Sequence, residues 1–165
     1  MILTERLLLR PCELDDLDAL HAVYGDPEVT RYTTTYETRD DTRRALDTHI
    51  AAQKAEGFSF WAVIERESGE LIGDAGLGRL EGKGPEVELG YTLGRRWWGR
   101  GYATEAGRAW LEYGLGPLGL ERIVAVVYPQ HAASIHVLEK LGMRPAGTRH
   151  AYGAELLLFE LEAPG

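Results

Sequence analysis

The spacing of apolar residues predicts strands and helices from the start of the chain. The segment 4–10 is typical of a strand. Apolar side chains spaced for one face of a helix follow it: Leu14, Leu17, Leu20 and Tyr24. Gly25-Asp26-Pro27 ends that helix. Thr38 and Asp41 form a capping-box pattern, which predicts a second helix that stops at Gly57.

The rest of the chain alternates between the same two spacings. Strands are predicted over 58–65, 70–77, 86–93, 122–128, 143–149 and 152–162. A helix is expected from about residue 102, and another after Gln130, with Ile135, Leu138 and Leu141 facing inward and Gly142 as its C-terminal cap. The order predicts an α/β fold of mixed α+β type, in which one sheet carries helices on both faces. We expect a single domain over residues 1–165.

Composition narrows the possible functions. A chain of 165 residues with 44% apolar residues and a mean hydropathy of -0.25 is typical of a soluble globular protein. No apolar run suits a membrane span and no leader pattern is visible, so we expect a cytoplasmic protein. Cys12 is the only cysteine and the five histidines lack metal spacing, so no metal is expected. A net charge of -8 argues against nucleic-acid binding and is compatible with a cationic amine substrate.

The run Arg96-Trp-Trp-Gly-Arg-Gly101 lies between a predicted strand and a predicted helix. The start of a helix presents unpaired N–H groups and the positive end of the helix dipole. Gly99 and Gly101 allow the backbone to approach an anion closely, and Arg95, Arg96 and Arg100 add positive charge. This joint is therefore predicted to bind phosphate groups.

The same run carries a family resemblance. It matches the signature of the GCN5-related N-acetyltransferases (GNAT), which is arginine or glutamine, two residues, glycine, one residue, then glycine or alanine. The neighbouring runs are similar to the RimJ/RimL-type branch, which includes acetyltransferases of ribosomal-protein N-termini. These runs are Thr4-Glu-Arg-Leu-Leu-Leu-Arg-Pro11, Glu88-Leu-Gly-Tyr91, Tyr102-Ala-Thr-Glu-Ala106 and 133–143.

The resemblance implies the GNAT fold and acetyl-CoA as acetyl donor. That fold has a central twisted mixed sheet of six to seven strands, splayed between strands 4 and 5 and flanked by about four helices. The main chain of Tyr91, Thr92 and Leu93 is then expected to hold the pantetheine arm. The pyrophosphate is expected on Arg96, Trp98, Gly99, Arg100, Gly101, Tyr102, Ala103 and Thr104. One of Trp97 and Trp98 is expected to pack under the turn and the other to cover the cofactor.

The chain departs from the family pattern at His131, where an asparagine near the pantetheine is usual. A histidine can donate a similar hydrogen bond, with different geometry and pH dependence. Other branches have a tyrosine where this chain has Leu138. Ser134 is therefore the hydroxyl expected to act as the acid toward the departing thiolate, or else to bond locally in the first turn of its helix.

Amide formation requires a neutral amine, so a base must accept a proton. Glu88 is the first candidate, because it matches the family glutamate and lies beside the expected splay. Glu86 is expected on the same strand face and is the alternate base. A surface ion pair is the competing explanation for either carboxylate.

The acceptor is expected to meet Tyr32, Thr33 and the residues up to Tyr36, with Glu86 and Trp61 also candidates for contact. Core packing is the competing role for the aromatic residues, and His21 and His49 are expected to be surface or core residues. The acceptor can be a protein N-terminus, a small-molecule amine or an amino-acid derivative. The competing function is a CoA-binding regulatory or interaction domain without turnover. The resemblance allows a monomer or a homodimer.

Overall fold

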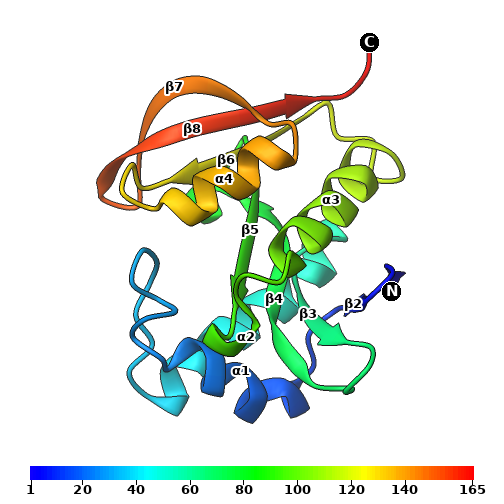
Figure 1. The fold of residues 1–165 in the computed structure, drawn as a ribbon, viewed down its shortest axis with the longest axis vertical. Helices are drawn as coiled ribbons and strands as arrows, with labels where there is room; N and C mark the ends of the chain where they lie inside the picture. Colours follow the sequence, from blue (N-terminus) through cyan, green and yellow to red (C-terminus); the bar gives the residue numbers. More distant parts are fainter.

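The computed structural model describes residues 1–165 and contains one eight-stranded sheet with helices on both faces (Figure 1). The strands lie in the order β1-β2-β3-β4-β5-β6-β8-β7. They are β1 Ile2–Leu3, β2 Leu7–Arg10, β3 Phe60–Glu65, β4 Leu71–Arg79, β5 Val87–Leu93, β6 Arg122–Val127, β7 Arg144–Ala151 and β8 Ala154–Glu162. The helices are α1 Leu17–Tyr24, α2 Arg39–Glu56, α3 Tyr102–Leu115 and α4 Ala132–Lys140. None of them combines the length and apolarity that crossing a membrane requires.

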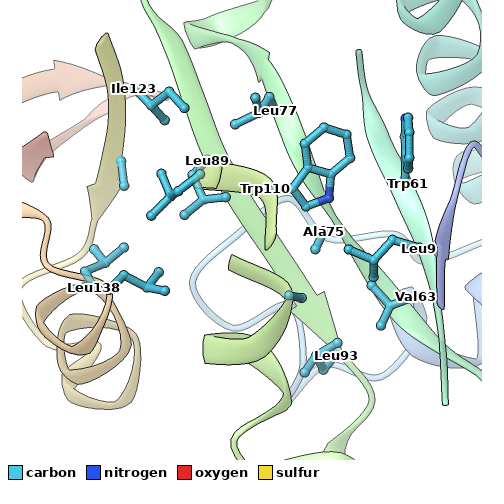
Figure 2. Close-up of a cluster of buried hydrophobic side chains, with 14 of the residues drawn as sticks. Leu9, Trp61, Val63, Ala75, Leu77, Leu89, Leu93, Trp110, Ile123 and Leu138 are labelled. Carbon is cyan, nitrogen blue, oxygen red and sulfur yellow. The ribbon is translucent and has the colours of Figure 1, made fainter. Parts of the chain in front are cut away.

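The two faces of the sheet bury separate apolar cores, because successive strand residues point to opposite sides. Leu9, Trp61 and Val63 face α3, where Trp110 is fully buried among residues of β2 to β6 (Figure 2). The alternate residue Ala62 faces α1 and α2, and packs with Leu20 and Leu46. The sheet is thereby held rigidly between two helical layers.

The sheet opens between β5 and β6. Every other neighbouring pair is antiparallel, whereas β5 and β6 run parallel and share a single register pair, Glu88 with Val124. Past this pair the two strands diverge, which leaves the last residues of β5 without a strand partner on that side. This confirms the predicted splay between the strands at 86–93 and 122–128.

The mixed sheet, the four helices and their order are confirmed, but the number of strands differs from the prediction. The sheet has eight strands rather than six to seven, because a two-residue strand, β1, lies before the predicted strand 4–10, of which only residues 7–10 form β2. A turn at Thr4 separates β1 from β2. Its N–H donates to the Leu7 carbonyl at 2.9 Å and its hydroxyl oxygen accepts from the Leu7 N–H at 3.0 Å, which closes a turn.

The predicted capping box of α2 is confirmed. The Thr38 hydroxyl accepts from the Asp41 N–H at 3.1 Å, and the Asp41 carboxylate accepts from the Thr38 N–H at 3.0 Å. Gly57 ends the helix in the left-handed region with a φ of 79°. The cap fixes where α2 begins, immediately after the loop that follows α1.

Thr38→Ala is expected to destabilise the protein by about 1 kcal/mol, because the Asp41 N–H loses its side-chain acceptor. Thermal unfolding monitored by circular dichroism measures the loss. Thr48→Ala is the matched control, since the exposed Thr48 hydroxyl bonds only the Arg44 carbonyl within the same helix. Equal melting temperatures for Thr38→Ala and wild type would contradict a stabilising role for this cap.

Candidate active site

The turn between β5 and α3 has the geometry of an anion site. Gly99 and Gly101 both adopt left-handed backbone angles, with φ of 73° and 81°. Gly101 is the N-cap of α3 and provides no capping side chain, so the first N–H groups of the helix, from Tyr102 to Thr104, are not capped by it. The turn therefore offers backbone donors and the positive end of a 14-residue helix to an anion.

A hydrogen-bond network ties this turn to the N-terminal strands. The Arg6 guanidinium donates to the Arg100 carbonyl at 2.8 Å and to Glu105 Oε1 at 2.7 Å. Glu105 also accepts from the Thr4 hydroxyl and from the Arg6 N–H. Tyr102 lies under the Arg6 guanidinium and its hydroxyl donates to Glu65. The Thr4-Glu-Arg6 segment thus holds the turn in place.

The three arginines of the turn differ in their availability. Arg95 forms a two-pronged ion pair with Asp26, with N–O distances of 3.0 and 2.9 Å. Arg96 and Arg100 are exposed, and their guanidinium carbons lie 4.7 and 5.1 Å from the Trp97 ring centroid. Arg96 approaches Glu70 only at 3.9 Å. Two of the three positive charges are therefore free to meet an anion.

The two tryptophans of the turn, Trp97 and Trp98, differ in burial, as expected from the sequence. Trp97 is buried in the core beneath the turn, whereas Trp98 is 47% exposed. The Trp98 indole N–H donates to the Leu93 carbonyl at 2.8 Å, so the ring is fixed at the end of β5. The exposed ring of Trp98 therefore lies beside the turn, at the end of β5.

The backbone of β5 offers hydrogen-bond donors to the splay. The Gly94 N–H donates to the Ile72 carbonyl at 2.8 Å, so Gly94 is paired with β4. Because pairing alternates along an antiparallel strand, the N–H and C=O groups of Leu89, Tyr91 and Leu93 face β6, and those of Thr92 face Asp74 of β4. The Trp98 N–H already bonds the Leu93 carbonyl. The free edge of β5, which means the backbone groups left for a ligand, therefore consists of the N–H and C=O of Tyr91 and the N–H of Leu93.

A cavity of about 470 Å³ opens at the splay and extends across the sheet to the loop after α1. Tyr32 and Thr33 line it, together with Tyr91, Thr92, His131, Ser134 and Glu88. The structure thus brings predicted acceptor residues, predicted cofactor residues and both predicted catalytic residues to one cavity. Its other polar and aromatic lining residues include Tyr24, Tyr36, His49, Phe60, Asp74, Tyr128 and Tyr152.

Glu88 is a buried carboxyl group at one end of this cavity. It is 9% exposed, and its pKa is raised to about 7. Burial raises this pKa by more than the hydrogen bond donated by the Tyr152 hydroxyl lowers it. Glu88 appears in no ion pair. A carboxyl group that titrates near neutrality can accept a proton and release it again, which is what a general base requires.

Ser134 lies on the other face of β5 and is paired with Tyr91. The Tyr91 hydroxyl is 2.8 Å from Ser134 Oγ and 3.3 Å from the Ser134 carbonyl oxygen. Burial raises the pKa of Tyr91 to about 12, so the phenol remains protonated. Leu138 also lines the cavity and contributes no hydroxyl. The side chain of Tyr91, expected from the sequence only for its main chain, thus joins Ser134 as a second hydroxyl.

His131 precedes α4 and contacts the loop after α1 at the cavity. Its ring stacks on Tyr32 with centroids 4.6 Å apart and an interplanar angle of 24°. Burial lowers its pKa, so the ring is neutral at neutral pH. His131 makes no side-chain cap at the start of α4. In this structure the His131 ring therefore stacks on Tyr32 and does not form the hydrogen bond to the helix start that an asparagine would make.

Comparison with known proteins agrees with this geometry. The family described as acetyltransferase (GNAT) domain matches residues 6–144. The chain belongs to the GNAT acetyltransferases. The resemblance inferred from the glycine turn is therefore confirmed, and the chain is by family an N-acetyltransferase.

Relatives and solved structures support the same assignment. An uncharacterized N-acetyltransferase p20 of Bacillus licheniformis is 37% identical over 155 residues, which are 90% of this chain and 85% of the relative. Spermidine N(1)-acetyltransferase of Escherichia coli is 28% identical over 84% of this chain and 73% of its own. An acetyltransferase structure from Agrobacterium tumefaciens has a TM-score of 0.86 and 29% identity, covering 98% and 93%. The ribosomal L7/L12 acetyltransferase RimL, in complex with coenzyme A, shares the fold, with a TM-score of 0.81, 16% identity and coverage of 97% and 96%.

Two residues expected at the acceptor lie elsewhere in this GNAT chain. Trp61 is 3% exposed, packs edge-on against Trp110 and donates to Gln53 at 2.7 Å, so it belongs to the core and not to the cavity. Glu86 precedes β5 and does not line the cavity. Its carboxylate pairs with Arg149, which holds its pKa below the usual value. These positions leave Trp61 a packing residue and make Glu86 a poor base.

Sequence reasoning missed a second buried polar group on the cavity wall. Asp74 is 5% exposed and accepts a hydrogen bond from the Tyr24 hydroxyl, which lies 3.1 Å from His49 Nε2. His49, expected as a surface or core residue, is partly buried and lines the cavity. The available signal was a carboxylate in the middle of an apolar strand, in the run Ile72-Gly-Asp-Ala-Gly76.

Proposed function

We propose that residues 1–165 act as one acetyltransferase domain, which transfers the acetyl group of acetyl-CoA directly to the primary amine of a small molecule. The single observation that carries this proposal is the cavity at the splay. It is reached by the buried Glu88 carboxyl from one face of β5 and by the Tyr91–Ser134 hydroxyl pair from the other.

The residues of the turn and of β5 fit coenzyme A. Its pyrophosphate would meet the N–H groups after Gly101 and the free charges of Arg96 and Arg100. Its pantetheine arm would pair with the free edge at Tyr91 and the Leu93 N–H. When bound, acetyl-CoA supplies a thioester carbonyl and a thiolate leaving group.

Glu88 is the base in this proposal. The amine nitrogen forms a bond to the thioester carbonyl carbon while its proton passes to the Glu88 carboxylate, directly or through water. The carbon–sulfur bond breaks, the departing thiolate accepts a hydrogen bond from the Ser134 hydroxyl, which Tyr91 orients, and the proton on Glu88 then passes to water or to the thiolate. Backbone N–H groups on the free edge of β5 stabilise the charge that develops on the carbonyl oxygen.

Direct transfer is favoured over an acetylated enzyme. Cys12 is the only cysteine of the chain, and it is buried outside the cavity, where its thiol donates to the Phe60 carbonyl. Burial raises the pKa of that thiol to about 12, which removes its nucleophilic form at neutral pH. The attacking nucleophile is then the acceptor amine itself.

The aromatic walls of the cavity favour a small-molecule acceptor over a protein N-terminus. A volume of about 470 Å³ with tyrosine and phenylalanine walls is of the size that small ligands occupy. The relative named spermidine N(1)-acetyltransferase supports a small amine as the acceptor class.

Release of free thiol from acetyl-CoA, measured with and without a panel of small amines, tests the proposed function. We expect amine-dependent release with at least one small amine. A protein that binds acetyl-CoA but releases no thiol with any amine would instead be a regulatory or interaction domain of the same fold.

The thiolate step predicts a graded series of variants. Ser134→Ala is expected to lower kcat by about tenfold to a hundredfold and to leave KM for the amine nearly unchanged, because the hydroxyl acts only on the leaving group. Tyr91→Phe is expected to have a smaller effect, since Ser134 retains its own proton. Steady-state kinetics with a fixed amine measures both. If Ser134→Ala retains the wild-type kcat, the serine has no role in the thiolate step.

A further inference from the structure

The cavity has a second carboxyl group on the same face of the sheet as Glu88. Asp74 of β4 is paired with Thr92 of β5, and directly paired residues share a face. Thr92 and Glu88 are four residues apart on one strand, so they also share a face. At about 3.3 Å of rise per residue, the backbone positions of Asp74 and Glu88 are about 13 Å apart along the strand direction.

The surface between them is smooth and aromatic. Gly76 and Gly90 are directly paired there, and neither has a side chain. The ring of Phe60 covers Gly90 and Gly78, with Cε1 only 2.7 Å from where a Cβ on Gly90 would lie and Cε2 2.9 Å from where a Cβ on Gly78 would lie. Tyr24 and Tyr36 stack at the Asp74 end with ring centroids 4.7 Å apart. An extended aliphatic chain suits such a surface, and a cation beside it gains from the ring faces.

Asp74 has no cationic partner in the protein. It appears in no ion pair, and its side chain accepts only from the Tyr24 hydroxyl. His49 lies beyond Tyr24, and burial lowers its pKa to about 4, so it brings no positive charge at neutral pH. Burial also raises the pKa of Asp74 to about 7. A buried carboxylate without a counter-charge, on the wall of a cavity, is a site that a cationic ligand would stabilise.

We infer that Asp74 binds a second cationic nitrogen of the acceptor, which makes the acceptor class a diamine or polyamine with one nitrogen at Glu88 and another at Asp74. This inference rests on the proposed function and adds the substrate class to it. The aliphatic chain between the nitrogens lies over Phe60, and Asp74 determines specificity without touching the reacting atoms.

Calorimetric titration of the protein saturated with CoA tests the inference without requiring turnover. The probes are α,ω-diaminoalkanes of increasing chain length, each beside the n-alkylamine of the same length, at mildly alkaline pH. We expect the best diamine to bind about tenfold to a hundredfold more tightly than its monoamine, as for a charge-assisted hydrogen bond. Asp74→Asn should reduce this preference to within about twofold. Equal affinities in wild type, or a preference kept in Asp74→Asn, would overturn the inference.

Controls separate recognition from folding. Asp47→Asn removes an exposed carboxylate on α2, outside the cavity, and should leave the diamine preference intact. Asp74→Asn should be at least as stable as wild type at mildly alkaline pH. In wild type, the stability that protonated Asp74 contributes is fully present below the ordinary aspartate pKa and is lost as the pH rises through about 7. The side-chain amide of Asp74→Asn does not ionise, so the variant does not lose stability in this way. If no amine causes thiol release from acetyl-CoA, the proposed function fails. The calorimetric titration measures the preference for diamines without turnover, so it still tests the role of Asp74.

Discussion

Glu88→Gln is expected to lower kcat/KM for the amine by about a hundredfold to ten-thousandfold, the usual contribution of a positioned base. Glutamine keeps the shape of the side chain and can still accept from the Tyr152 hydroxyl, but it cannot take the proton from the attacking amine. Binding of acetyl-CoA should be unchanged, because Glu88 lies on the opposite face of β5 from the Tyr91–Ser134 pair.

The pH dependence of kcat gives a second test of Glu88 as the base. Burial raises the pKa of Glu88 to about 7, and the carboxylate is the active form, so wild-type kcat should rise with pH through about 7. This limb should be absent in Glu88→Gln. Glu86→Gln is the comparison, since its carboxylate is paired with Arg149 outside the cavity, and it should stay within about threefold of wild type. A large loss in Glu86→Gln with a small loss in Glu88→Gln would give the role of base to Glu86.

Gly101→Val is expected to weaken acetyl-CoA binding by about a hundredfold, or about 2.8 kcal/mol. A β-branched residue at a φ of 81° is strained, and relief of that strain would distort the turn that presents the first N–H groups of α3. Titration calorimetry with CoA measures the loss.

Gly57→Val is the matched control for this strain. Gly57 has a φ of 79°, and no atom lies within 4 Å of the place a Cβ would occupy, but it caps α2 far along the chain from the phosphate turn. We expect both variants to lose similar melting temperature and only Gly101→Val to lose CoA affinity. Unchanged CoA affinity in Gly101→Val would mean that the pyrophosphate binds elsewhere.

The features that the sequence predicted well are those governed by local chemistry. The capping box at Thr38, the ends of α2 and α4 at Gly57 and Gly142, and the glycine turn follow from backbone preferences of a few residues. The splay followed from the family resemblance. These local signals were enough to indicate the fold and the family.

The features that the sequence did not predict depend on contacts between distant residues. Asp74 meets Tyr24 across 50 positions, and Tyr91 meets Ser134 across 43, so neither pair is visible in local spacing. Trp61 lies on a strand, where a side chain can face either side, and only its packing against Trp110 places it in the core rather than at the acceptor. The acceptor end of the cavity is built almost wholly from such contacts.

Mass-spectrometric counting of both products of one reaction tests whether the acetyl group passes directly from acetyl-CoA to the amine with Glu88 as base. Protein, acetyl-CoA and a diamine are mixed, and free CoA, acetylated amine and intact protein mass are quantified together. We expect equal amounts of CoA and acetylated amine, an unmodified protein, and loss of both products in Glu88→Gln. Tight binding of acetyl-CoA without acetylated amine, or an acetyl group carried on the protein itself, would contradict this expectation.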